Sequence, residues 1–193
     1  TAPELGSEVI KACIKHSHLK TNDVDTVYMG QVLTTGVGQN PARQAAIYAG
    51  ISKDKTATTI NQVCGSGLAS IALAFNSIKC GDGNVMIAGG QESMSNAPHF
   101  INLRNGFKMG PGTLSDSMII DGLWDIYNNY HIGITAENIA EKYQITREDQ
   151  DSFAFQSQKK ARDAIKAKKF KDEIIPIKIK NKKQEITFDT DEY

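Results

Sequence analysis

Apolar residues concentrate between residues 58 and 75. β-Branched residues dominate positions 58–63, Cys64 follows, and two glycines come within the next three residues. A mostly apolar run then extends to Phe75 without a helix breaker. This order is typical of a buried strand, a tight turn that glycine permits, and a buried helix. The pattern therefore predicts a strand–turn–helix unit with Cys64 at the junction.

The same pattern predicts further elements on both sides of this unit. An apolar stripe at helical spacing, which includes Cys13, indicates a helix near the start of the chain. Short apolar runs at residues 24–29 and 85–88 predict two more strands. Because strand, helix and strand in this order form a right-handed parallel crossover, we expect a parallel α/β arrangement. Functional groups in such sheets gather at the carboxyl ends of the strands, where Cys64 and Gly89 are expected.

The alternation of strands and helices stops near residue 94. Residues 95–130 contain several glycines, and their apolar side chains are scattered. A long irregular stretch inside a compact chain is usually functional or a partner surface. We therefore expect an amino-terminal α/β domain over residues 1–93 and a loop subdomain over residues 94–193.

Two helices and a hairpin are expected in the second part. Thr135 is a candidate N-cap for a short helix. Thr146, with Asp149 three residues later, forms an imperfect capping box for a longer helix that reaches about Lys169. Two apolar runs between residues 174 and 188 predict a terminal hairpin.

The composition restricts the class of protein. The chain has 40% hydrophobic and 23% charged residues, with a net charge of zero. This balance gives no reason to expect nucleic acid or an anionic membrane as a partner, and no apolar run approaches the roughly 18 residues that span a bilayer. Three cysteines without paired spacing indicate a reducing compartment, so we expect a cytoplasmic protein. The same spacing offers no zinc site, and no metal is expected.

Cys64 is the strongest candidate for chemistry. Free backbone N–H groups and the dipole at a helix amino end favour an anion, so a thiol there shifts towards the reactive thiolate. The alternative is a small core residue, which we expect for Cys13 on its apolar stripe. Cys80, at the carboxyl end of the predicted helix, is expected to be structural. Residues 65–67 fit neither a dinucleotide-binding loop nor a hydrolase nucleophile elbow, because the required glycines are missing.

Two motifs resemble the thiolase family. They read Asn-Gln-Val-Cys-Gly-Ser-Gly at residues 61–67 and Ala-Gly-Gly-Gln-Glu-Ser-Met-Ser at residues 88–95, and the resemblance extends over the whole chain. Members of this family make or cleave acetoacetyl-CoA and longer 3-ketoacyl-CoA thioesters. In the family, the cysteine that matches Cys64 is the nucleophile that carries the acyl group as a thioester.

The resemblance implies a fold with more parts than this chain contains. It predicts a thiolase-like α/β fold, with a mixed sheet, helices on both faces and an inserted loop subdomain. The chain matches roughly the amino-terminal half of the family pattern, so the second half of the fold and the first strand are expected to be absent. The family motifs Gly-His-Pro, Cys-x-Gly and Asn-Glu-Ala-Phe, which supply the remaining catalytic groups, do not occur. We therefore expect that this chain alone does not turn over.

The resemblance also implies substrates and binding residues. Leu123 and His131 match positions that line the acyl and pantetheine pocket, although a partly exposed loop histidine is the alternative for His131. Ile132 stands where the short-chain branch commonly has methionine. The implied reaction transfers an acetyl group between CoA thioesters and forms or cleaves acetoacetyl-CoA. Coenzyme A is a co-substrate, no prosthetic group is implied, and a homo-oligomer, dimer or tetramer, is expected.

Three alternatives stay open. The first is a 3-ketoacyl-CoA thiolase for longer chains. The second is a ketoacyl synthase of the same fold, which the Met- and Ser-rich loop after Gly90 argues against. The third is a non-catalytic remnant that binds CoA or forms oligomers, which the missing histidine and second cysteine favour.

Overall fold

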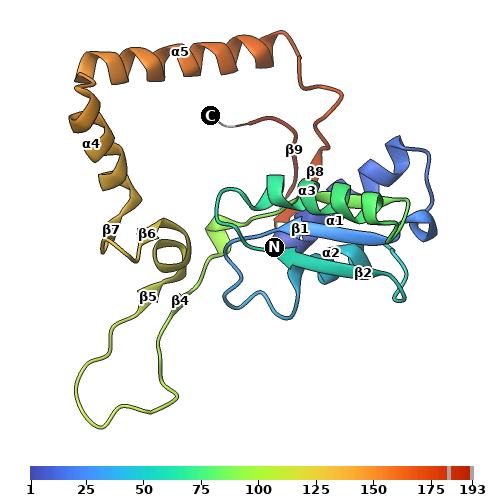
Figure 1. Cartoon of the computed structure of the whole chain (residues 1–193), viewed down its shortest axis with the longest axis horizontal. Helices are drawn as coiled ribbons and strands as arrows, with labels where there is room; N and C mark the ends of the chain where they lie inside the picture. Colours follow the sequence, from blue (N-terminus) through green and yellow to red (C-terminus); the bar gives the residue numbers. More distant parts are fainter. Residues whose placement is uncertain (182–183, 192–193) are drawn as a thin grey trace. The chain divides into compact units, whose positions relative to one another are not determined.

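The chain divides into two compact units. The computed structural model describes residues 1–181 and 184–191, and the units are Thr1–Trp124 and Asp125–Tyr193 (Figure 1). The main elements of the first unit are α1 (Ala2–His16), β1 (Thr26–Gly30), α2 (Pro41–Tyr48), β2 (Thr56–Ile60), α3 (Ser66–Cys80) and β3 (Met86–Gly90). Short elements follow: two 3₁₀ turns η1 (Thr21–Asp23) and η2 (Met94–Asn96), strands β4 (His99–Phe100) and β5 (Ser115–Asp116), and a π-helical turn η3 (Ile119–Leu123).

A three-stranded parallel sheet forms the centre of the first unit. Its strand order is β2-β1-β3, and Thr26 of β1 pairs with Thr56 on one side and Met86 on the other. All three strands therefore end at the same edge, at Gly30, Ile60 and Gly90. The expected α/β class with a parallel sheet is confirmed. A mixed sheet is not seen among the described residues and stays an expectation for the complete fold.

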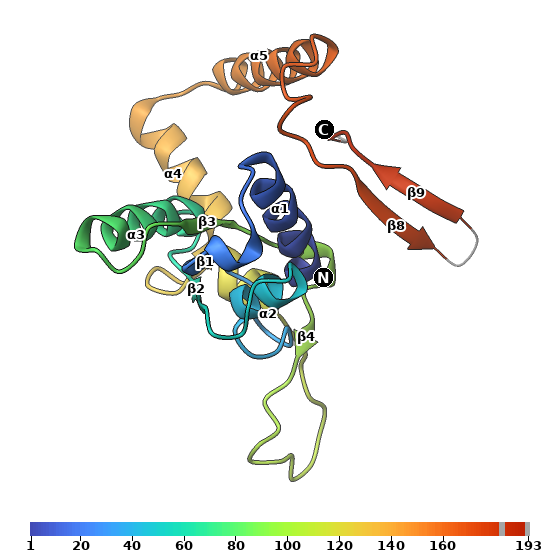
Figure 2. The same ribbon diagram turned by 90° about the vertical axis from the view of Figure 1, so that its right-hand side faces the viewer.

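Helices cover both faces of the sheet. Helix α2 contacts α1, β1 and β2, whereas α3 contacts β1 and β3 (Figure 2). Successive side chains of β1 point to opposite faces of the sheet, so each face can pack against its own helices. On one face, Val27 and Met29 are buried in the core cluster with α1 and α2. Tyr28 points the other way, and its hydroxyl lies 2.9 Å from the Ser77 hydroxyl of α3 in a hydrogen bond.

The buried face of α1 combines small and apolar residues. Gly6, Ser7 and Ile10 are buried, and a Cβ on Gly6 would lie 3.3 Å from the Cβ of Ala45 on α2. The prediction that Cys13 belongs to the core was wrong, because the buried face of α1 passes through Ile10 and Ile14 and leaves the Cys13 side chain exposed. Cys80, expected to be structural, is also exposed. All three cysteines therefore have solvent-accessible side chains.

Residues 94–124 belong to the first unit by compactness. Strands β4 and β5 pair antiparallel, His99 with Asp116, and the segment between them is mostly exposed. The predicted boundary between residues 93 and 94 concerns a subdomain of the family fold, and it stays a prediction.

The second unit begins at Asp125, within the short hairpin of β6 (Trp124–Asp125) and β7 (Tyr130–His131). It continues with α4 (Ile132–Tyr143), α5 (Arg147–Lys166) and the antiparallel hairpin of β8 (Ile177–Asn181) and β9 (Gln184–Phe188), as Figure 2 shows. The capping box of Thr146 and Asp149 is confirmed at the start of α5. Helix α4 starts earlier than predicted, because His131 and not Thr135 caps it. The tip of the predicted hairpin, residues 182–183, lies outside the described residues.

One helical stretch among the described residues, Val63–Cys80, is long and apolar enough to cross a bilayer, with a mean hydropathy of 1.3. The expectation that no run reaches this length was therefore wrong. A core helix of a soluble protein meets the same criterion, so this finding is weak evidence for a membrane. Only 17% of the stretch is buried, which leaves most of α3 uncovered in this chain.

Candidate functional site

Cys64 lies at the carboxyl edge of the parallel sheet, as predicted. It follows β2 and precedes α3, whose N-cap is Gly65, and its side chain is exposed. Two backbone hydrogen bonds extend the sheet just past its last residues: Gln31 N–H donates to Ile60 O (3.0 Å) and Gln91 N–H donates to Gly30 O (2.9 Å). The thiol therefore stands above an ordered edge, next to the amino end of a helix, where the dipole favours an anion.

The turn that presents Cys64 is strained. Val63 has a φ of +49°, in the left-handed region that β-branched residues rarely adopt. Two side chains hold it there. Asn61 Oδ1 accepts from the Val63 N–H at 2.9 Å, and Ser66 Oγ donates to the Val63 carbonyl oxygen at 2.5 Å. Strain next to a reactive side chain is common at functional sites, because the surroundings must over-determine the conformation.

Glycine brings the start of α3 close to the sheet. A Cβ at Gly30 would lie 2.6 Å from the carbonyl carbon of Ser66 and 2.8 Å from the backbone nitrogen of Gly67. These are backbone atoms, so no side chain can be accommodated without moving the helix. Gly90 packs at the same place, and a Cβ there would be 3.8 Å from the Cα of Gly67. This contact fixes the distance between the turn that carries Cys64 and the carboxyl ends of the strands.

Leu123 lies in the first unit, at the end of η3, and is partly buried. The Thr35 hydroxyl donates to Asp121 Oδ2 at 2.9 Å, which ties η3 to the loop after β1. That loop leaves the same sheet edge as Cys64. The structure therefore attaches the element that carries Leu123 to the edge that carries the candidate nucleophile.

His131 and Ile132 lie in the second unit, at the start of α4. His131 is the N-cap, and its Nδ1 accepts from the Gly133 N–H at 3.0 Å. The ring proton is thereby assigned to Nε2, and the exposed ring and the neighbouring exposed Ile132 are accessible. A pocket that combines Leu123 with these two residues stays a prediction.

Asp125 stabilises the hairpin turn that precedes His131. Its carboxylate accepts from Asn128 Nδ2 (2.8 Å) and from the N–H groups of Tyr127 (2.9 Å) and Asn128 (3.0 Å). The side-chain bond from Asn128, followed by the backbone bond from the same residue, holds the pKa of Asp125 below its ordinary value. The turn is thus built around an ionised carboxylate.

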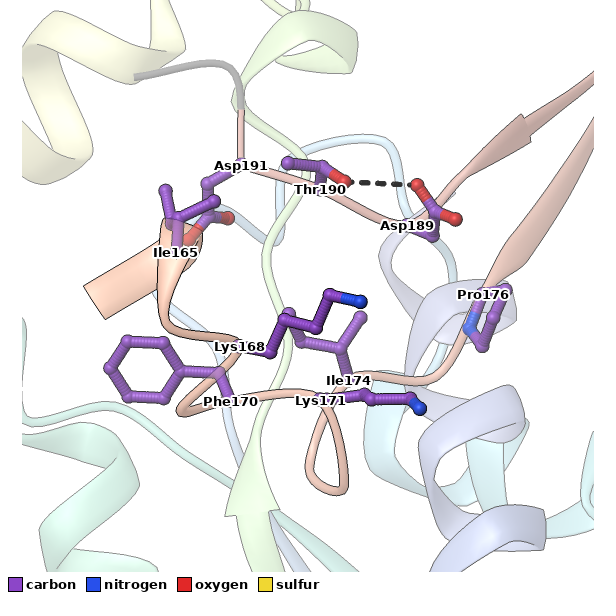
Figure 3. Close-up of a pocket in the computed structure, with 9 residues that line it drawn as sticks. All are labelled: Ile165, Lys168, Phe170, Lys171, Ile174, Pro176, Asp189, Thr190 and Asp191. Carbon is purple, nitrogen blue, oxygen red and sulfur yellow. Dashed lines mark hydrogen bonds between the residues drawn. The ribbon is translucent and has the colours of Figure 1, made fainter. Parts of the chain in front are cut away.

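Figure 3 shows a separate cavity of about 510 Å³ in the second unit, between the segment after α5 and the chain after β9. Lysines and carboxylates alternate with apolar residues around it: Ile165, Lys168, Phe170, Lys171, Ile174, Pro176, Asp189, Thr190 and Asp191. The Thr190 hydroxyl donates to the neighbouring Asp189 at 3.0 Å. None of the residues predicted for the site lines this cavity.

Asn61 and Ser66 were not predicted as individual contributors to the site, although both stand inside the first motif. Short polar side chains next to a turn commonly bond to the local backbone, and this signal could have identified them. Within residues 1–181 and 184–191, no group of three or more His, Cys, Asp and Glu side chains could hold a metal ion. The expectation that no metal takes part stays a prediction.

Comparison with known proteins covers the whole chain. Residues 1–193 match the family described as thiolase, N-terminal domain. The chain is 56% identical to an acetyl-CoA acetyltransferase of Cupriavidus necator, with 100% of this chain and 49% of that protein covered. It is 55% identical to an acetyl-CoA acetyltransferase of Pseudomonas aeruginosa (99% and 49%) and 53% identical to one of Rhizobium meliloti (100% and 49%). The chain spans about half the length of the curated relatives it matches.

Proposed function

The chain belongs to the thiolase family, and from this we propose that the protein of which it is the N-terminal domain transfers acetyl groups between CoA thioesters. Cys64 would carry the acetyl group as a thioester, and the reaction would form or cleave acetoacetyl-CoA. The observation that carries this proposal is the exposed Cys64 thiol on a strained turn, at the amino end of α3 and the carboxyl edge of the sheet. A nucleophile needs this combination of access and electrostatic support.

The first half of the reaction uses Cys64. Its thiolate sulfur attacks the thioester carbonyl of acetyl-CoA, the bond from that carbonyl to the CoA sulfur breaks, and CoA leaves as its thiolate. A new carbon–sulfur bond to Cys64 holds the acetyl group. Negative charge develops on the carbonyl oxygen during the attack, and N–H groups at the first turn of α3 are suited to stabilise it.

The second half needs groups that we place outside these 193 residues. A base must remove a proton from the α-carbon of a second acetyl-CoA, whose carbon then attacks the Cys64 thioester and releases the sulfur as thiolate. The family motifs that supply such a base do not occur in this sequence. We propose that the rest of the protein provides them and that this chain alone does not complete a cycle.

Leu123, His131 and Ile132 are proposed to line the acyl and pantetheine pocket. With Nδ1 of His131 accepting from Gly133, Nε2 carries the proton and can donate to a thioester or amide oxygen. A short acyl chain is preferred in this proposal, and a longer-chain 3-ketoacyl-CoA substrate is the second candidate. We further propose CoA as co-substrate without a metal or prosthetic group, a cytoplasmic location and a homo-oligomer of two or four subunits.

The decisive experiment compares two cysteines in the complete protein. We expect Cys64→Ser to lower the rate of acetoacetyl-CoA cleavage by about a thousandfold or more, because the covalent route is lost. Cys13→Ser removes another exposed thiol and should leave the rate unchanged. Peptide mapping after incubation with acetyl-CoA should find the acetyl group on Cys64. A Cys64→Ser protein with the full wild-type rate would overturn the proposal.

A further inference from the structure

Two carboxylates bind the backbone at opposite ends of the β1–β3 pair. At the carboxyl end, Glu92 accepts from the N–H groups of Val32 (2.9 Å) and Leu33 (3.2 Å). At the amino end, Asp25 Oδ2 accepts from the N–H groups of Asn84 (2.8 Å) and Val85 (3.1 Å). The two arrangements are alike in chemistry, because each carboxylate binds two consecutive backbone N–H groups. Only the Glu92 end adjoins the turn that presents Cys64.

The contacts of Glu92 continue to that turn through Asn61. Val32 is bound on both sides of its backbone, since its N–H donates to Glu92 and its carbonyl oxygen accepts from Asn61 Nδ2 at 3.5 Å. The other end of the same amide, Asn61 Oδ1, accepts from the Val63 N–H at 2.9 Å. A continuous path therefore runs from Glu92 through Val32 and Asn61 to the residue before Cys64. The 3.5 Å bond is its longest and weakest step.

The loop that this path crosses is held from a second direction. Gln31 Nε2 donates to the Leu33 carbonyl oxygen at 2.8 Å, and Gln91 Nε2 donates to Gln31 Oε1 at 2.9 Å. Both glutamine side chains are buried. The loop is thus fixed firmly enough to serve as an anchor for Asn61.

We propose that Glu92 is a positioning residue for Cys64, acting through Val32 and Asn61 on the strained conformation of Val63. A β-branched residue at a φ of +49° relaxes towards extended backbone unless its surroundings hold it. Loosening Asn61 frees the Val63 N–H and lets the Cys64 sulfur leave its place at the start of α3. The inference rests on the proposed role of Cys64 as the nucleophile.

The test measures the alkylation rate of each cysteine by iodoacetamide in the purified chain at one pH, using peptide mass mapping. Cys13 and Cys80 are exposed and serve as internal references. In Glu92→Gln the amide nitrogen cannot accept, so one backbone bond is lost. We expect the Cys64 rate, relative to the two references, to fall about threefold, as when an anion leaves the field of a helix amino end.

Two further variants separate positioning from stability. Asn61→Asp keeps an acceptor for the Val63 N–H but loses the donor to Val32, so it should give the same fall. Combining it with Glu92→Gln should add nothing, because both act on one path. Asp25→Asn removes the equivalent bond at the far end of the strands and should leave the ratio unchanged. If Glu92→Gln fails to fold, Asn61→Asp alone decides.

The outcomes distinguish this inference from the proposed function. If Glu92→Gln and Asn61→Asp leave the relative Cys64 rate at its wild-type value, the positioning role is wrong even when Cys64 is the nucleophile. An equal fall in Asp25→Asn would also contradict it, because the effect would then be general loss of stability. If the complete wild-type protein never acetylates Cys64, the proposed function fails, whatever the alkylation rates show.

Discussion

At the level of single residues, two glycines, Gly30 at the end of β1 and Gly67 at the start of α3, have very different surroundings. A Cβ at Gly30 would meet the backbone of Ser66 and Gly67 at less than 3 Å, whereas a Cβ at Gly67 would meet nothing within 4 Å. Neither glycine has a positive φ. Alanine at Gly30 therefore tests the contact that sets the Cys64 turn against the sheet, and alanine at Gly67 is the comparison at an open position.

We expect Gly30→Ala to lower the free energy of unfolding by about 1–3 kcal/mol, the range found for overpacking. Gly67→Ala should change it by less than about 1 kcal/mol, with stabilisation favoured because alanine suits a helix better than glycine. Urea unfolding of both variants measures the difference. Equal stability of the two variants would show that β1 and α3 approach each other less closely than the structure indicates.

At the level of elements, the sequence pattern predicted those helices and strands whose formation depends on neighbouring residues. The three strands of the parallel sheet and α3 followed from runs of apolar and β-branched residues, and the start of α5 followed from the Thr146 and Asp149 pair. The two-residue strands β4 to β7 were not predicted. The start of α4 was misplaced, because a histidine is an uncommon cap. The buried face of α1 was misassigned, because it combines Ile10 with the small residues Gly6 and Ser7, and such small residues carry little hydrophobic signal.

The same distinction between local and long-range contacts applies to the candidate site. The position of Cys64 depends on neighbouring residues, and the sequence predicted it correctly. The contacts of Glu92 with Val32 and Leu33 join residues about sixty positions apart through backbone N–H groups, which carry no residue-specific signal. Such contacts appear only once the strands are paired. This is why the path from Glu92 to Cys64 was not predictable from the pattern.

Helix α5 provides a test of an element that depends on local bonds. It contains no buried residue, so its stability rests on propensity and capping. We expect Thr146→Ala to destabilise α5 by about 1 kcal/mol, through loss of the bond from the Asp149 N–H to Thr146 Oγ1 (3.1 Å). Hydrogen exchange of α5 amides should accelerate about fivefold, a factor that corresponds to 1 kcal/mol, while β1 amides stay unchanged.

The matched control is Thr135→Ala. The sequence pattern predicted Thr135 as an N-cap, but Thr135 lies inside α4, and His131 is the N-cap of that helix. Alanine should therefore leave α4 as stable or slightly more stable, because threonine is the poorer helix former. Faster exchange throughout α4 in Thr135→Ala would contradict the observed helix start and restore the predicted one.

At the level of the whole molecule, the apolar surface of α3 is the dominant feature. A helix that is apolar on most sides belongs in an interior, yet Leu68, Ile71 and Phe75 are 74%, 54% and 59% exposed. The chain spans about half the length of its relatives, and this surface is uncovered in it. Exposed apolar patches of this kind drive association in water. We therefore expect the isolated chain to self-associate through α3.

Replacing Ile71 and Phe75 by lysine should shift the isolated chain from oligomers or aggregates towards monomer in sedimentation measurements at equal concentration. Both residues are more than half exposed, so the fold should tolerate the change. Replacing Leu5 and Val9 on α1 by lysine adds the same two charges at exposed apolar residues outside this surface and should have little effect. If this α1 variant disperses the chain as well as the α3 variant does, net charge and not the α3 surface controls association. A wild-type chain that is monomeric and dissolves readily would remove the premise, because α3 would then not drive association despite its exposure.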